Sequence, residues 1–113
     1  QHSLQMMLEF YHQGKISLEK INEKMSHAPA VCFQIKERGF LREGYFADAV
    51  LVDLQKPFKV EPRNIFYKCG WSPLENYTFQ SYIEKTFVSG HLAFDNGAFN
   101  ETVQGKRLMF NRK

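Results

Sequence analysis

The stretch "TFVSGHLAFDNG", Thr86 to Gly97, carries the clearest fold signal in the sequence. Two apolar runs, Thr86 to Val88 and His91 to Phe94, flank the dipeptide Ser89-Gly90. A two-residue loop with a glycine available for positive φ is typical of a tight hairpin between antiparallel strands. The residues Asp95 to Gly97 then end the second strand. The C-terminal half of the chain is therefore predicted to contain an antiparallel sheet.

A further strand is predicted before this hairpin. Ala49 to Val52 form a short apolar run that is entered through the turn-forming residues 42–48, and this pattern predicts a buried strand. Asp48 is expected to hold the turn and Asp53 to end the strand. Their odd separation puts them on opposite faces, which argues against a shared proton or metal ion. Residues 55–82 contain three prolines and little periodicity, and they are predicted to form an ordered loop with short strands or turns.

The N-terminal part of the chain has helical periodicity. The first predicted helix has Ser3 as its N-cap and Gly14 as its C-terminal stop. Its apolar residues at helical spacing are Leu4, Met7, Leu8 and Tyr11, with Met6 and Phe10 broadening the stripe. A second helix is predicted from Ser17, as its N-cap, to about Ser26. One side of it carries Leu18, Ile21 and Met25, whereas Glu19 and Glu23 face solvent.

A third, short apolar helix is predicted to begin afresh at Ser26 or His27, either of which can cap it, with Pro29 in its first turn. Its apolar residues are Ala30, Val31, Phe33 and Ile35. Gly39 is expected to end the helical half. Helices come first and strands last, without alternation, so the predicted fold class is α+β and no βαβ unit is predicted.

Composition and charge narrow the classes of function. The 113 residues, 43% of them hydrophobic, have the composition of a globular protein. The net charge of +3 comes from scattered basic residues, so no nucleic-acid partner is predicted, and the most basic stretch, residues 105–113, is expected to form a final strand. No apolar run is long enough to predict a membrane partner, and the unpaired Cys32 and Cys69 favour a reducing cytoplasm. We expect the chain to be a piece of a longer protein.

Few residues are able to carry out catalysis. The four histidines lie ten or more positions apart, and no known metal-binding spacing brings two ligands together. We interpret His12 as a partner of the helix dipole, His27 as a structural residue at a helix junction and His91 as a cross-strand residue. The role of His2 stays open.

The stretch "KCGWSPLENYTF", residues 68–79, combines a cysteine, the only tryptophan, a proline and an acid. Cys69 has a lysine beside it but no histidine within several residues to act as a base, so a buried or half-buried structural role is predicted. The stretch is predicted to be a packed turn. Trp71 and Phe79 would anchor it to the core, and Pro73 would fix the bend. Ser72 and Glu75 would form a capping-box-like pair. The sequence therefore predicts no self-contained catalytic or metal site.

Three stretches in a fixed order resemble a known family. Residues 23–53 are similar to the segment in which cyclic amidohydrolases leave their last barrel helix and enter a small β domain. Residues 68–79 resemble the S-P-x-E-G loop of these enzymes, with Asn76 where glycine is usual, and residues 86–101 resemble their closing hairpin. The set resembles above all the C-terminal portion of the dihydroorotase branch. Within the first stretch, the positions that match the family pattern are Gly39, Gly44, Ala47, Asp48 and Asp53.

The resemblance implies an architecture. Residues 1–38 would be the last helices of a (β/α)₈ metal-dependent hydrolase barrel, and residues 39–113 the C-terminal strands of an accessory β-sandwich domain. Because barrel active sites form at the loops that follow the strands, Gln1 and His2, which enter the first helix, are the expected substrate-proximal residues. Gly90 is expected to be structural, and so are the turn residues Trp71, Ser72, Pro73 and Glu75.

The resemblance also implies an activity. Dihydroorotases are zinc-dependent hydrolases of pyrimidine biosynthesis that interconvert N-carbamoyl-L-aspartate and dihydroorotate. Their metal polarises the amide carbonyl and activates water. The resemblance places every metal ligand and catalytic residue before Gln1. This chain alone is therefore expected to bind no zinc and to be inactive. Its expected partner is the rest of the barrel, and the parent enzyme is expected to act on a small-molecule substrate. A homodimer is a further expectation.

Two alternatives stay open. The parent could have a sister activity, that of a dihydropyrimidinase, hydantoinase or allantoinase, because these enzymes share the late motifs. The chain could instead be a free-standing, non-catalytic interaction module. In that case its helices would expose an apolar patch that finds a partner or aggregates, made of Leu4, Met7, Leu8, Leu18 and Ile21.

Overall fold

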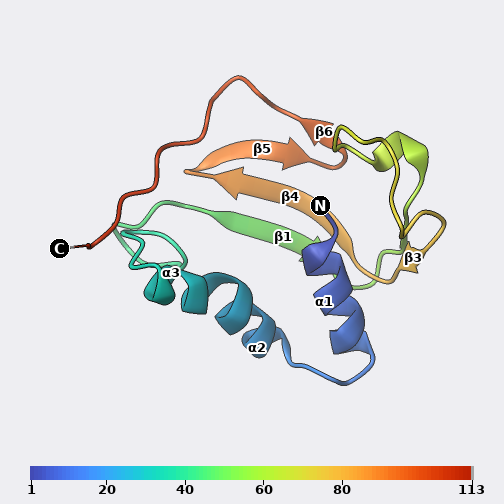
Figure 1. Cartoon of the computed structure of the whole chain (residues 1–113), viewed down its shortest axis with the longest axis horizontal. Helices are drawn as coiled ribbons and strands as arrows, with labels where there is room; N and C mark the ends of the chain where they lie inside the picture. Colours follow the sequence, from blue (N-terminus) through green and yellow to red (C-terminus); the bar gives the residue numbers. More distant parts are fainter. Residues whose placement is uncertain (113) are drawn as a thin grey trace.

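A four-stranded antiparallel sheet with the strand order β1-β4-β5-β6 forms the centre of the fold (Figure 1). The structure is a computed structural model in which residues 1–112 are described. The strands of this sheet are β1 (Ala49–Asp53), β4 (Tyr82–Val88), β5 (His91–Asp95) and β6 (Ala98–Phe99). Two short strands, β2 (Phe58–Lys59) and β3 (Thr78–Phe79), pair as a second antiparallel sheet.

The hairpin predicted at Ser89-Gly90 is confirmed. Val88 pairs with His91, and the two loop residues have φ values of 52° and 80°. Positive φ at both central positions is the backbone of a type I′ turn, whose twist matches that of the flanking strands. A second such turn follows at Asn96-Gly97, with φ values of 48° and 92°, and connects β5 to β6. The predicted stop of β5 is thus confirmed, and it is also the start of another hairpin.

Strand β1 lies at the edge of the sheet and pairs antiparallel with β4 alone. The predicted strand is confirmed, but its predicted burial is wrong. Val50 and Leu51 are 46% and 50% exposed. Successive side chains of a strand point to opposite faces, so neither face of the strand is covered at these positions. The apolar run indicated a strand correctly, whereas burial also depends on what packs against it.

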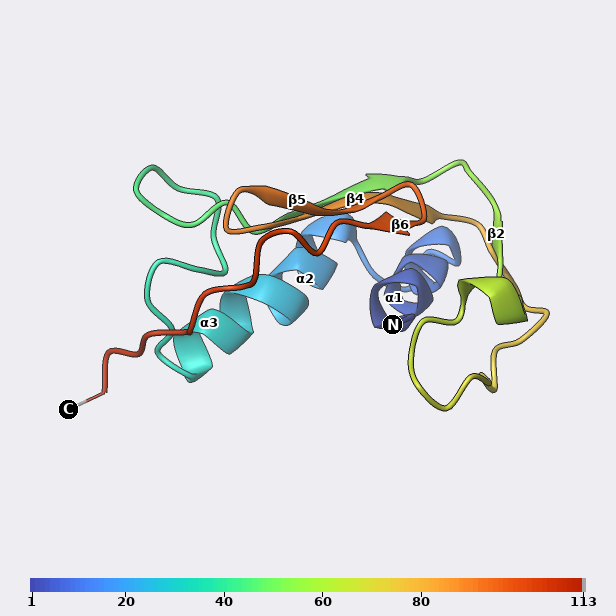
Figure 2. The ribbon, with the colours of Figure 1, turned by 90° about the horizontal axis from the view of Figure 1, so that it is seen from above.

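All three α-helices lie on the same face of the sheet (Figure 2), namely α1 (Ser3–His12), α2 (Leu18–Asn22) and α3 (Ala28–Cys32). The predicted N-cap of α1 is wrong by one residue, because His2 occupies that position and Ser3 is already helical. The predicted stop at Gly14 is confirmed. Gly14 has a φ of 72°, and the N–H groups of Gly14 and Lys15 donate to the carbonyls of Tyr11 and Phe10, which is a Schellman motif.

The second predicted cap is correct, since Ser17 Oγ accepts a hydrogen bond from the Lys20 N–H at 3.1 Å. The predicted break at Ser26 and the fresh cap at Ser26 or His27 are wrong. A π-helical turn, Glu23–His27, joins α2 to α3 without an interruption, and the Ala28 N–H donates to the Glu23 carbonyl. Pro29 follows in the first turn of α3, as predicted.

Gly39 does not terminate a helix, because α3 already ends at Cys32. Instead it packs against the helical layer with a φ of +83°. A Cβ atom at this position would lie 2.4 Å from the Ala30 Cβ and 2.9 Å from the Ser26 carbonyl oxygen. Gly44 has a similar φ of +81° but no atom within 4 Å of such a Cβ. Glycine at residue 39 is therefore required by conformation and by space, and at residue 44 by conformation alone.

A charged corner attaches the connection before β1 to the β4–β5 turn. The buried Arg38 donates from Nη1 to Asp48 Oδ2 at 2.6 Å and from Nη2 to Ser89 Oγ at 3.1 Å. Asp48 Oδ1 also accepts from the Ser89 N–H at 2.8 Å, and the Gly90 N–H donates to the Ala47 carbonyl at 2.9 Å. Asp48 thus holds the turn as predicted. Asp53 ends β1, also as predicted.

The region from residue 55 to 82 is an ordered loop with short elements, as predicted. It holds β2, β3 and a 3₁₀ turn, Pro62–Asn64, which is closed by a reciprocal capping box of Glu61 and Asn64. The final strand predicted at residues 105–113 is wrong for the described residues 105–112. They make only an isolated bridge between Phe110 and Ile35, and Lys113 lies outside the described residues.

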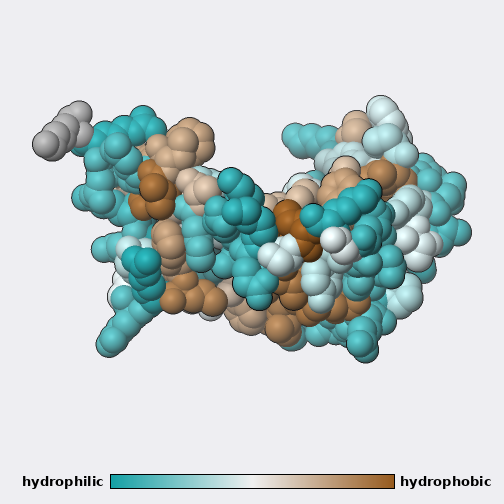
Figure 3. Space-filling model, turned by 90° about the horizontal axis from the view of Figure 1, so that it is seen from below, coloured by the Kyte–Doolittle hydropathy of each residue, from teal (hydrophilic) through white to brown (hydrophobic). Residues whose placement is uncertain are grey.

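The core is small. The buried hydrophobic side chains are Leu8, Ile21, Ala30, Val60 and Phe79. Many large apolar side chains are exposed, and Figure 3 shows hydrophobic atoms interspersed with hydrophilic ones on a surface hollowed between two projecting ends. The three α-helices followed by antiparallel strands confirm the α+β class. The barrel and sandwich assignments, and the domain boundary between residues 38 and 39, stay predictions. Across residues 1–112, no helix is long and apolar enough to cross a membrane.

Candidate functional site

Gln1, one of the two predicted substrate-proximal residues, is exposed, but both polar atoms of its side-chain amide are hydrogen-bonded. Its Nε2 donates to the Asn64 carbonyl at 2.7 Å, and its Oε1 accepts from the Phe66 N–H at 3.0 Å. These bonds tie the entrance of α1 to the loop around the 3₁₀ turn. Gln1 is therefore a crosslink between distant segments, and its closeness to a substrate stays a prediction.

His2, the other predicted residue, is buried between aromatic rings. Its imidazole stacks on Phe79 with 6.0 Å between ring centroids and lies tilted to Phe58 at 6.5 Å. Its Nε2 is buried and has no hydrogen-bond partner among residues 1–112. Burial, and secondarily the positive charge of the amino terminus, lower the pKa of His2 below its ordinary value of 6.5. His2 is thus predominantly a neutral imidazole at pH 7, with one donor and one acceptor nitrogen.

Besides the core residue Leu8, α1 turns polar side chains toward the segment between β3 and β4. Gln5 Nε2 donates to the Ser81 carbonyl at 3.3 Å, and His12 Nε2 lies 2.8 Å from Ser81 Oγ. Between them, the buried Glu9 accepts from the Gln80 N–H at 2.6 Å. We call Gln5, Glu9 and His12 the polar seam. Their spacing puts all three on one side of the helix, where Gln5 and Glu9 satisfy the backbone between β3 and β4 and His12 contacts the Ser81 hydroxyl.

Glu9 of the polar seam also contacts Tyr77 and affects the pKa of its hydroxyl group. The Tyr77 hydroxyl donates to Glu9 Oε2 at 3.4 Å. Loss of hydration, followed by the negative charge of Glu9, raises the pKa of Tyr77 above its ordinary value of 10.0. Tyr77 therefore remains a protonated hydrogen-bond donor at neutral pH.

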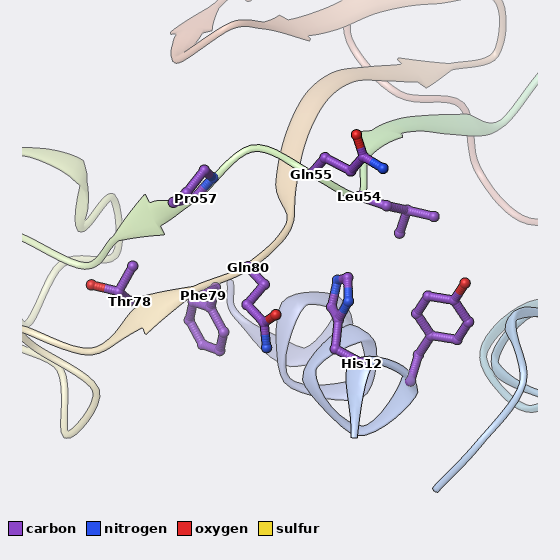
Figure 4. Close-up of a pocket in the computed structure, with 8 residues that line it drawn as sticks. His12, Leu54, Gln55, Pro57, Thr78, Phe79 and Gln80 are labelled. Carbon is purple, nitrogen blue, oxygen red and sulfur yellow. The ribbon is translucent and has the colours of Figure 1, made fainter. Parts of the chain in front are cut away.

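A cavity of about 580 Å³ opens beside the seam. Figure 4 shows His12 rising from α1 toward Gln55, with Gln80 beside it. The lining residues are Tyr11, His12, Leu54, Gln55, Pro57, Thr78, Phe79 and Gln80. They include no carboxylate, ammonium or guanidinium group. The Ser81 and His12 pair resembles a nucleophile with its base, but Ser81 is 0% exposed and cannot be reached by a substrate.

Sequence reasoning placed His12 in the last turn of α1, where it is found, but missed its bond to Ser81 and missed Gln5 and Glu9. Both missed residues interrupt the apolar stripe that was predicted to face the core. Their partners lie about 70 residues away in the sequence, so no local pattern reports the contacts. The only available signal in the sequence was that Gln5, Glu9 and His12, which can donate or accept hydrogen bonds, lie on one face of the predicted helix.

The stretch of residues 68–79 packs differently from the prediction. Phe79 is a core anchor as predicted, but Trp71 is 62% exposed and anchors nothing among the described residues. Cys69 is also exposed, which contradicts the predicted burial, and its thiol donates to the Trp71 carbonyl at 3.5 Å. An aromatic residue signals available apolar area, but the covering partner has to come from elsewhere.

The turn itself is built largely as expected. The Glu75 N–H donates to the Ser72 carbonyl at 3.1 Å, with Pro73 at the second position of the turn. The buried Ser72 Oγ accepts from the Leu74 N–H at 3.1 Å, so only half of the predicted capping pair involves a side chain. Asn76 has a φ of 71°, the left-handed backbone that glycine adopts freely and asparagine tolerates.

The remaining histidines have structural surroundings. His27 stacks on Phe40 with 4.2 Å between centroids, and its Nε2 lies 3.2 Å from Asn22 Nδ2. His91 is a cross-strand residue, as predicted, with Nε2 2.9 Å from the Asn100 carbonyl oxygen. Among residues 1–112, no three His, Cys, Asp or Glu side chains are grouped so that they could hold a metal ion. The described residues do not fit a zinc centre, and no metal-assisted step is assigned to them.

Known proteins match nearly the whole chain. A dihydroorotase from Pyrococcus horikoshii is 28% identical over 104 residues, which are 92% of this chain and 25% of that protein. An allantoinase from Desulfitobacterium hafniense is 32% identical over 103 residues, 91% of this chain and 23% of that protein. The chain thus spans about a quarter of the length of the curated relatives it matches. No protein-family model matches the chain.

Solved structures agree with the sequence relatives. The L-hydantoinase (dihydropyrimidinase) from Arthrobacter aurescens superposes with a TM-score of 0.78 at 28% identity, over 87% of this chain and 22% of that one. A D-hydantoinase, at 22% identity and a TM-score of 0.74 over 85% of this chain and 21% of that one, shares the fold. By sequence and by fold, the chain is similar to cyclic amidohydrolases and is consistent with a C-terminal portion of such a protein.

Proposed function

We propose that this chain is the C-terminal portion of a dihydroorotase, which interconverts N-carbamoyl-L-aspartate and dihydroorotate in pyrimidine biosynthesis. The observation that carries the proposal is the match to a dihydroorotase over 92% of the chain. The motifs at residues 23–53, 68–79 and 86–101 support the same branch.

In this proposal the chain contributes structure to the active site and does not supply reacting groups. Its helices would complete a (β/α)₈ barrel, and its strands would complete an accessory β-sandwich. The α+β arrangement and the likeness to L-hydantoinase support this assignment. The zinc ligands and the groups that move protons would come from the rest of the protein, because residues 1–112 offer no metal-binding group. Gln1 and His2 would lie at the boundary between the two contributions.

The proposal is tested by assaying the full-length protein that contains this chain. We expect it to hydrolyse dihydroorotate, to lose that activity on removal of metal by a chelator and to regain it with zinc. The 113-residue chain, assayed in parallel, is expected to turn over no dihydroorotate and to bind no zinc stoichiometrically. Turnover by the short chain alone would contradict the proposed division of roles.

A sister activity is the second candidate, and one observation favours it. The matched allantoinase is more similar in sequence, at 32% identity, than the Pyrococcus dihydroorotase, and the superposed solved structures are hydantoinases. A panel of dihydroorotate, allantoin, hydantoin and dihydrouracil on the full-length protein separates the candidates. A kcat/KM at least about tenfold higher for one of the other three rings would replace dihydroorotate as the assigned substrate.

A non-catalytic interaction module is the remaining alternative. It predicts that the short chain is monomeric, soluble and cooperatively folded at high concentration, and that the full-length protein hydrolyses none of the four rings. The cytoplasmic location and the homodimer stay predictions. Sedimentation of the full-length protein tests the homodimer.

A further inference from the structure

A second cavity lies between the sheet, the start of α1 and the loop that follows β2. Its volume is about 390 Å³, within the range of about 300–1,000 Å³ that is typical of small-molecule sites. It shares no lining residue with the cavity beside His12. Figure 2 shows α1 and this loop on the same side of the sheet. The cavity is therefore bounded by three parts of the chain that lie far apart in the sequence.

Aromatic rings form one wall of this cavity. Phe66 meets Phe99 edge to face, with 4.8 Å between ring centroids, and Phe94 meets Phe99 in the same way at 5.2 Å. Phe94 and Phe99 are cross-strand partners on β5 and β6, so their side chains share a face of the sheet. Phe66 comes from the loop, where its N–H donates to Gln1 Oε1. The wall is thus held in place by the strand register and by the Gln1 bond.

The lining of the cavity carries no charge. None of the described residues that line it is Asp, Glu, Lys, Arg or His. A charged group placed there would lose its hydration without gaining a partner. Phe66 and Phe99 are 43% and 55% exposed, so the wall still has apolar area to offer. The cavity therefore favours an uncharged molecule, and its aromatic wall favours one that contains a ring.

An acceptor in the cavity lacks a partner. Gln5 lines the cavity and is only 5% exposed, and its Nε2 donates to the Ser81 carbonyl at 3.3 Å. A carbonyl oxygen can only accept, so this contact fixes the orientation of the amide and leaves Oε1 as its other end. Among residues 1–112, Gln5 Oε1 accepts no hydrogen bond. A molecule that donates to this atom gains an interaction that an apolar molecule of the same shape lacks.

We propose that this cavity binds a small, uncharged aromatic molecule that carries a hydrogen-bond donor, such as a phenol or an indole. Its ring lies against Phe66 and the paired phenylalanines of β5 and β6, and its O–H or N–H group donates to Gln5 Oε1. The inference goes beyond the proposed function and does not depend on hydrolysis of a cyclic amide.

Equilibrium dialysis of matched probes against the full-length protein tests the proposal. The probe 2-naphthol is an uncharged ring with a donor, 2-methoxynaphthalene lacks the donor, and 2-naphthoate is an anion. We expect 2-naphthol to bind, and 2-methoxynaphthalene to bind about tenfold more weakly because one hydrogen bond is lost. The anion should bind more weakly than 2-naphthol by at least as much, because the cavity offers it no cation.

Variants place the binding in this cavity. Phe66→Ala removes part of the aromatic wall and should weaken the binding of 2-naphthol about tenfold. Phe33→Ala is the matched control, since Phe33 is also exposed but does not line the cavity, and should leave binding unchanged. Gln5→Met removes the acceptor and should bring the affinities for 2-naphthol and 2-methoxynaphthalene within about twofold of each other. The comparison of the probes on the unmodified protein keeps its force if Gln5→Met fails to fold.

Each outcome decides the proposal. A full-length protein that binds no 2-naphthol would overturn it, and so would a Phe66→Ala protein that binds as well as the unmodified one. Equal affinities for 2-naphthol and 2-methoxynaphthalene would also overturn it, because the donor would then have no role. The expected order of binding in a protein that hydrolyses no cyclic amide would support this site and reject the proposed function, whereas hydrolysis without binding would do the reverse.

Discussion

Helix α1 and the connection before β1 are both attached to the sheet through polar groups, but the interactions that attach them differ. The polar seam of α1 consists of hydrogen bonds from Gln5 and Glu9 to the backbone between β3 and β4 and of a contact between His12 and the Ser81 hydroxyl. The Arg38 corner combines a buried ion pair with Gly39, where no side chain fits. The stability of the seam should therefore depend on hydrogen-bonding capacity, and that of the corner on volume and charge.

Adding a methyl group at the corner should have the largest effect. Gly39→Ala forces a Cβ against the Ala30 side chain and the Ser26 backbone at a φ that alanine disfavours, and we expect it to lower the free energy of unfolding by at least about 3 kcal/mol. Gly44→Ala is the matched control, since it has the same φ and open space, and should cost about 1 kcal/mol. Urea titrations of both variants measure the difference, and equal losses would show that the close approach to Ala30 is not required.

Removing the charge of the corner should rank next. Arg38→Met leaves Asp48 and the Ser89 hydroxyl without their donor, and we expect a loss of about 2–4 kcal/mol, less than for a fully buried pair because Asp48 is one-third exposed. The double variant with Asp48→Asn should be more stable than Arg38→Met. A double variant no better than the single one would mean that the guanidinium acts by its packing over Phe46 and not by its charge.

The seam should be more tolerant. Glu9→Gln keeps the shape of the side chain but weakens the acceptor for the Gln80 N–H, and we expect a loss of about 1–2 kcal/mol. Glu19→Gln, on the exposed side of α2, is the control and should change stability by less than about 0.5 kcal/mol. A Glu9→Gln protein as stable as the control would show that the seam does not hold α1 in place.

The smallest effect should come from His2 and should appear only below neutral pH. Its folded-state pKa is lowered by burial, so the unfolded chain binds more protons between that pKa and 6.5. The free energy of unfolding should therefore be fully retained above pH 6.5 and fall as the pH drops through this window. His2→Phe keeps the aromatic ring and should flatten the dependence. Unfolding titrations at pH 7.5 and 5.5 compare the two proteins, and parallel losses would exclude His2 as the cause.

Local chemistry made parts of the fold predictable. The Ser89-Gly90 hairpin, the Ser17 cap and the Gly14 stop all depend on residues within one turn of each other, and all three are confirmed. Two of the wrong predictions depend on what packs against the residue or strand. Trp71 was expected to be buried because it is a large aromatic residue, and β1 because it is apolar throughout, but the described chain supplies no cover for either.

The candidate site was harder to predict because it is made of long-range contacts. Glu9 and Gln5 read as ordinary polar residues of an amphipathic helix until their partners at Gln80 and Ser81 are known. The prediction that the chain holds no catalytic constellation rests on residue spacing alone. The burial of Gln5 and Glu9 beside Leu8 could not be predicted in this way, because their hydrogen-bond partners lie far away in the sequence.

The two glycine turns of the sheet have a consequence for the order of folding. Strands β4, β5 and β6 are joined by two-residue loops, whereas β1 reaches β4 only across residues 54–81. Closing a long loop costs more entropy than closing a tight turn, so we expect the three-stranded meander to form first and β1 to join it later. Pulse-labelling hydrogen exchange during refolding should protect the amides of β5 before those of β1. A chain synthesised from its N-terminus would then hold its helices and β1 unpaired until its last third had emerged.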